Sequence, residues 1–142
     1  MGKLTEGIDS KYNPFCIMER RISEAQPAAP NAQEMAKYLG DFFSIELTAL
    51  MTLRDPEDPD KKIDTGSVNQ WTRGDLEPDP VAFGRLKAVY EIVKELVGME
   101  SAGIVIPWFM GMNPYLEDQS PAMMIAVDSQ AVREAAQAFI AE

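Results

Sequence analysis

The sequence predicts an all-α protein, with a helix-turn-helix-like bundle in its N-terminal part and a small helical domain after it. Apolar residues recur at spacings of three and four in several segments, which is typical of amphipathic helices. Capping residues and glycines stand where those segments begin and end. No segment has a period-2 alternation convincing enough for a strand. We expect three parts: residues 1–30, 31–98 and 99–142.

Residues 1–30 are predicted to form a flexible arm. The segment contains several glycines and prolines, and residues 26–30 have the Pro-Ala composition of an extended linker. Within it, residues 15–22 could form a short amphipathic helix.

Two helices are expected directly after the arm. Asn31 is a candidate N-cap, and Glu34 three residues later completes the pattern of a capping box. The apolar face of the first helix would consist of Met35, Leu39, Phe42 and Phe43. Ser44 can cap the second helix, whose apolar side would consist of Ile45, Leu47, Leu50, Met51 and Leu53.

A polar loop with two prolines separates these helices from the next two. A short third helix is predicted from Thr65 to Arg73, with Gly74 ending it. The longest helix is predicted over residues 81–97, ended by Gly98. Its apolar stripe would consist of Phe83, Leu86, Val89, Tyr90, Val93, Leu96 and Val97.

The C-terminal part is predicted to contain three shorter helices. The first covers residues 102–110, and the second covers residues 122–127 after Ser120 as N-cap and Pro121 at the first helical position. The last helix is capped by Asp128 or Ser129. Its inner face would consist of Val132, Ala135, Ala136 and Phe139.

Composition excludes several classes of function. The 142 residues contain no histidine and one cysteine, Cys16, so His-based triads, Cys–His pairs, common zinc sites and intrachain disulfides are excluded. We see no secretory signal and no apolar run near the roughly 20 residues that span a bilayer. The sequence therefore predicts a cytoplasmic binding protein rather than an enzyme, without catalytic residues, metal or cofactor.

The third predicted helix has the residue types of a DNA-recognition helix. Asn and Gln can bond adenine, and Arg can reach guanine or phosphate. The candidate DNA-binding residues are Ser67, Asn69, Gln70 and Arg73. Val68 and Trp71 would face the core. With the following Glu-Pro-x-Pro and amphipathic helix, this segment resembles the Xre-type helix-turn-helix of repressors and antitoxins.

Two features of this half disfavour contact with DNA. The two helices of such a unit are normally joined by 3–4 residues, whereas roughly ten mostly acidic residues separate Leu53 from Thr65. Residues 34–97 carry 13 acidic and 8 basic side chains, a net charge of −5, and the whole chain carries −10. A phosphate backbone favours the opposite sign of charge.

The block from Trp108 to the end resembles the toxin-binding domain of Xre/MbcA/ParS-like antitoxins. The matching residues are Trp108, Phe109, Asn113, Pro114, Leu116, Ser120, Pro121 and the closing helix through Phe139. The resemblance implies a type II antitoxin whose partner is a RES-domain toxin, an enzyme that degrades NAD. It also implies that the C-terminal domain covers the toxin's active-site entrance, and that the helix-turn-helix represses the antitoxin's own operon.

Carried over residue by residue, the resemblance assigns two roles. The frame of the toxin-binding domain would be Trp108, Asn113, Pro114, Leu116 and Pro121. Direct contacts to the partner would come from exposed neighbours, with Glu117, Asp118, Arg133 and Phe139 as candidates. The chain departs from the family in its acidic 117–119 loop. It also departs in its cluster of methionines, Met110, Met112, Met123 and Met124, which we expect to fill the core rather than to form an adaptable binding surface.

Two other functions fit the same residues. One is a DNA-binding transcriptional regulator of phage or plasmid type, with the C-terminal domain serving dimerisation. The other is an acidic decoy or anti-repressor that keeps the fold without binding DNA. A homodimer or a complex with the toxin is the expected assembly, and we expect no association with a membrane.

Overall fold

The computed structural model describes residues 30–142, so the predicted arm and its segment 15–22 lie outside the described residues, apart from Pro30. The described part contains helices and loops without a β-strand, which confirms the all-α fold class. In order, the elements are α1 (Ala32–Phe42), α2 (Ile45–Leu53), α3 (Thr65–Arg73), α4 (Pro80–Val97), α5 (Ala102–Met110), the 3₁₀ turn η2 (Pro114–Leu116), α6 (Pro121–Met124) and α7 (Ser129–Ala141). None of the described helices combines the length and apolarity needed to span a bilayer.

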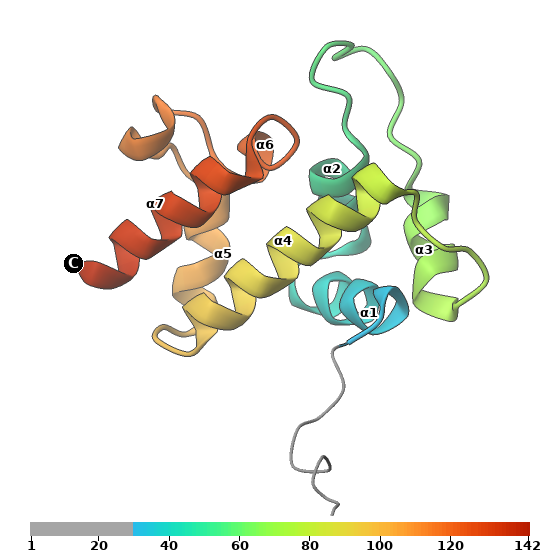
Figure 1. Cartoon of the computed structure of the whole chain (residues 1–142), viewed down its shortest axis with the longest axis horizontal. Helices are drawn as coiled ribbons and strands as arrows, with labels where there is room; N and C mark the ends of the chain where they lie inside the picture. Colours follow the sequence, from blue (N-terminus) through green and yellow to red (C-terminus); the bar gives the residue numbers. More distant parts are fainter. Residues whose placement is uncertain (1–29) are drawn as a thin grey trace, which may run out of the picture.

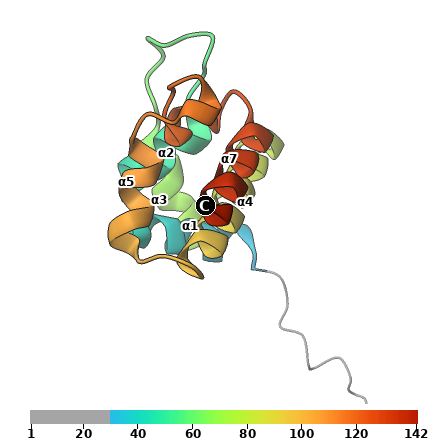
Figure 2. The same ribbon diagram turned by 90° about the vertical axis from the view of Figure 1, so that its left-hand side faces the viewer.

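The long helix α4 runs through the middle of the molecule (Figure 1). In that view α1, α2 and α3 lie towards the end of the molecule where α4 begins, and α5, η2, α6 and α7 lie towards the end where α4 finishes. The view turned by 90° shows α7 alongside α4 (Figure 2), and the two helices are in contact. The buried apolar side chains form one cluster with members from both groups of helices. The residues on either side of the predicted boundary at 98 therefore share a core, and α4 contributes to both halves.

The helix ends follow from local capping, as the sequence indicated. Asn31 and Glu34 form a capping box: the Glu34 backbone N–H donates to Asn31 Oδ1 at 2.8 Å, and the Asn31 N–H donates to Glu34 Oε1 at 3.1 Å. Ser44 Oγ accepts from the Leu47 N–H at 3.0 Å. Gly74 ends α3 with a φ of 77°, in the left-handed region that glycine tolerates best. These predicted caps are confirmed.

The buried face of α2 differs from the predicted one. Of the five predicted apolar residues only Met51 is fully buried, and the other four are half-buried. Thr48, Ala49 and Thr52 are buried beside it. Because α2 contacts α1, α3, α4 and α6, its burial does not follow a single stripe. The two buried hydroxyls are satisfied within the helix, since Thr48 donates to the Ser44 carbonyl at 2.7 Å and Thr52 donates to the Thr48 carbonyl at 2.8 Å.

Two further predictions need correction. Phe83 was expected in the apolar stripe of α4, yet its side chain is 38% exposed, whereas Leu86, Val89, Val93 and Leu96 of that stripe are buried. The helix predicted over residues 122–127 is shorter, because α6 ends at Met124 and is followed by a turn. This turn lets Asp128 adopt an extended φ of −158° and cap α7 by accepting the Ala131 N–H at 3.1 Å.

Candidate functional site

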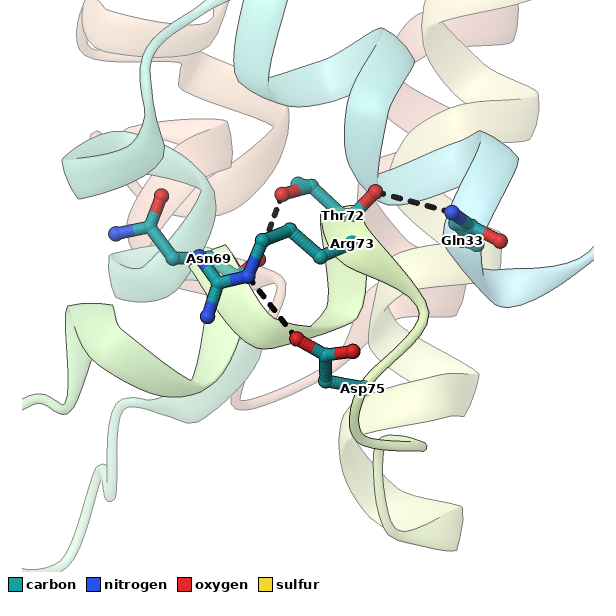
Figure 3. A network of polar contacts seen from close by, with 5 residues as sticks. All are labelled: Gln33, Asn69, Thr72, Arg73 and Asp75. Atoms are coloured by element: carbon teal, nitrogen blue, oxygen red, sulfur yellow. Dashed lines mark hydrogen bonds and ion pairs between the residues drawn. The ribbon is translucent and has the colours of Figure 1, made fainter.

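Helix α3 presents a polar surface that is held in place by two apolar side chains. Val68 and Trp71 are buried in the common core, as predicted. Asn69 and Gln70 are exposed on the outer side of the helix. Figure 3 shows the Asn69 amide pointing away from the neighbouring polar side chains, so it is available to a partner.

Carboxylates engage the other two candidate DNA-binding residues. The Ser67 hydroxyl donates to Asp64 Oδ2 at 2.9 Å, and this bond, together with the Ser67 backbone N–H, holds the pKa of Asp64 below its usual value. Arg73 Nε lies 3.1 Å from Asp75 Oδ2 in an exposed ion pair (Figure 3). The N-terminal end of the α3 surface therefore carries the negative charge of Asp64, and at the C-terminal end Asp75 neutralises the Arg73 cation, so the surface attracts phosphate weakly.

The loop between α2 and α3 adds to this acidic environment. It covers residues 54–64 and projects from the body of the molecule in both views (Figures 1 and 2). This connection is longer than the 3–4 residues that join the two helices of a helix-turn-helix unit.

Asn113 organises the C-terminal block. Its side chain is buried, and its Oδ1 accepts the Tyr115 N–H at 2.9 Å. Its backbone carbonyl accepts from both Leu116 and Asp118 at 2.9 Å, and its own N–H donates to the Gln119 carbonyl at 3.1 Å. These bonds close the 113–119 loop into a compact turn from which α6 begins.

An apolar groove lies beside this turn. We call it the C-terminal groove; it encloses about 250 Å³. It is lined by Trp108, Met112, Asn113, Pro114, Tyr115, Ala135, Phe139 and Glu142. The rings of Trp108 and Phe139 lie 5.9 Å apart between centroids. Met112 and Tyr115 are 81% and 64% exposed, so large apolar side chains at the groove are open to a partner.

The predicted frame residues fall into two groups. Asn113, Leu116 and Pro121 are buried, and Trp108 is half-buried. Pro114 is exposed and lines the C-terminal groove.

The predicted contact residues are also placed differently from one another. Glu117 and Asp118 are exposed, with φ of 56° and 66°. Phe139 lines the groove, while Arg133 forms an ion pair with Glu91 of α4 at 2.7 Å. An Arg133 engaged with α4 has less freedom to meet a partner than the acidic pair has.

The methionines of this block are not core fillers, contrary to expectation. Met110, Met112 and Met123 are 55%, 81% and 37% exposed, and only Met124 packs against the core as a half-buried residue. Sequence reasoning also missed Tyr115. For the methionines a local signal was present, because Met110 and Met112 flank Gly111, the residue at which α5 ends.

Two arginines connect the 54–64 loop to the C-terminal half. Arg54 donates to the Met123 carbonyl. Arg85 of α4 donates to the carbonyls of Thr52 at 3.2 Å, Arg54 at 2.9 Å and Ala126 at 3.2 Å. Burial, and next the nearby Arg54 cation, lower the pKa of Arg85. The ends of α2 and α6, whose last carbonyls lack partners within their own helices, are thus held together.

Comparison of the chain with protein-family models, with curated proteins and with solved structures finds no match. The structure itself describes an all-α protein with a polar α3 surface and an apolar C-terminal groove.

Proposed function

We propose that this protein is an antitoxin-like binding protein that neutralises an intracellular RES-type, NAD-degrading toxin by covering its active site. The observation that carries the proposal is the C-terminal groove. Asn113, which resembles a residue of the antitoxin motif, is buried at the groove, and its Oδ1 accepts the Tyr115 N–H at 2.9 Å. Met112 and Tyr115 line the same groove and are exposed. Exposed aromatic and methionine side chains around a concavity are characteristic of protein-binding surfaces.

The charges near the groove support the same partner. Glu142 lines the groove, and the exposed Glu117 and Asp118 belong to the adjoining turn. An enzyme that binds NAD must accommodate phosphate groups, for which a basic pocket is suited. An acidic rim would steer the protein onto such a pocket and raise the association rate at low salt.

The test is binding to, and rescue from, a RES-domain toxin encoded beside this gene. The wild-type chain should co-purify with the toxin and restore growth of cells that express it. Met112→Lys should weaken the complex by about 30-fold, the effect expected for a central interface residue worth about 2 kcal/mol. Met99→Lys is the matched control, because Met99 is 62% exposed in the turn after α4, outside the groove. If the wild-type chain neither binds nor rescues, the proposal is wrong.

The exposed amides of α3 favour a DNA-binding regulator as the second candidate. Asn69 and Gln70 are both exposed and could face base edges. A gel shift of the gene's own promoter DNA at low salt, abolished by the double change Asn69→Ala and Gln70→Ala, would support it. Absence of a shift at low salt would remove it.

A further inference from the structure

A second apolar groove lies between α1 and α4, apart from both surfaces described above. We call it the α1–α4 groove; it encloses about 330 Å³ and is lined by Pro30, Met35, Phe83, Lys87, Tyr90 and Glu91. Met35 is buried, Tyr90 is half-buried, and Phe83 is 38% exposed. The partly exposed Phe83 gives this concavity apolar surface on which another apolar group can pack.

The position of Pro30 favours a segment of the same chain as the occupant of the groove. Pro30 is the first described residue and itself lines the groove, so the preceding segment of the chain starts at the edge of the groove. An occupant from the same chain therefore needs no large displacement. Tethering also gives it a high effective concentration at the groove.

The sequence before Pro30 contains one segment with suitable side chains. Within residues 15–22, Phe15, Met18 and Ile22 stand at spacings of three and four, which places them on one face of a helical turn. The eight residue-to-residue steps from Ile22 to Pro30 can span about 26–29 Å when extended, so the segment can reach the groove that Pro30 lines. Glu19 supplies a charge opposite to that of Lys87 on the α4 wall.

We propose that residues 15–22 dock in the α1–α4 groove of the same chain, with their apolar side chains covering the partly exposed Phe83. This contact is independent of the proposed antitoxin function. It would bring Cys16, which belongs to the docking segment, close to Lys87.

The single cysteine of the chain makes this proposal testable in the full-length protein. In one variant Lys87→Cys places a second thiol on the groove wall. In the matched control Lys37→Cys places it on the exposed side of α1, where Lys37 lines a different pocket with Gly40 and Asp41. Position 37 is nearer to Cys16 along the chain than position 87, so chain connectivity alone favours the control. Disulfide formation in a glutathione redox buffer is followed by non-reducing electrophoresis and peptide mass mapping.

We expect the intrachain disulfide from Cys16 to form at least about tenfold faster in Lys87→Cys than in Lys37→Cys, because docking raises the local thiol concentration. Adding Phe83→Asp, a change at a partly exposed position, should abolish this advantage while circular dichroism remains that of a folded protein. Equal rates, or a faster rate in Lys37→Cys, would refute the docking. Disulfides between two chains instead of within one would also refute it, because the occupant would then be a second copy.

Discussion

Arg85 joins three backbone segments, and its replacement by methionine tests how much this junction stabilises the fold. Arg85→Met keeps most of the aliphatic stem but leaves the carbonyls of Thr52, Arg54 and Ala126 without their donor. A hydrogen bond from a charged donor contributes about 1.5–3 kcal/mol when buried. Here the group is only partly buried, and burial of the cation itself has a cost, which is the main cause of its lowered pKa. We therefore expect a net loss of about 2–3 kcal/mol, well below the sum of three full bonds.

Urea unfolding measures this loss, with fluorescence reporting on Trp71 in one half of the molecule and Trp108 in the other. Because both halves share one core, a single transition with an unchanged m-value is expected. The matched control is Arg73→Met, which breaks an ion pair whose side chains are 59% and 61% exposed and should cost less than about 0.5 kcal/mol. If Arg85→Met unfolds at the same urea concentration as the control, the junction does not stabilise the fold as argued.

Three smaller changes test local features of the same structure. Gly74→Ala should destabilise by about 1 kcal/mol, because its φ is +77° and an added Cβ would lie 3.0 Å from Gln33 Oε1. Gly84→Ala should stabilise the fold by about 0.5–1 kcal/mol, because Gly84 lies within α4 and no atom is within 4 Å of the added Cβ. The midpoint of thermal unfolding should therefore fall in Gly74→Ala and rise in Gly84→Ala. Shifts of the same sign would contradict the geometry. The hydrogen bond from Ser67 lowers the pKa of the Asp64 carboxyl in the folded protein below 3.8. The contribution of this bond to the free energy of unfolding is therefore fully present above pH 3.8, and it is lost as the pH falls through the pKa of the folded state. The stability difference between wild type and Ser67→Ala should therefore shrink on acidification in that range, and a difference that persists below it would exclude this origin.

Features that depend on neighbours in the chain were predicted well. The capping box of Asn31, the Ser44 cap, the end of α3 at Gly74 and the start of α6 at Pro121 all appear where the sequence indicated. Each rests on a side chain or a backbone preference that acts within three or four residues, so no knowledge of the fold is needed.

The candidate sites were predicted less completely, because exposure depends on what packs nearby. The sequence located the C-terminal block and the α3 surface, but it assigned Met110 and Met112 to the core and did not single out Tyr115. It also could not reveal that Arg133 contacts Glu91, a residue 42 positions away.

The sequence by itself thus determined the helical class, most helix boundaries and the absence of histidine chemistry, since periodicity, caps and composition are local or additive properties. The tertiary structure alone decided that threonines of α2 are buried, that Phe83 is partly exposed and that α4 serves both halves of one core. It also decided that Arg54 and Arg85 connect the acidic loop to the C-terminal half. These properties depend on contacts between segments far apart in the chain, and neither the period of one helix nor the residues at its ends specifies them.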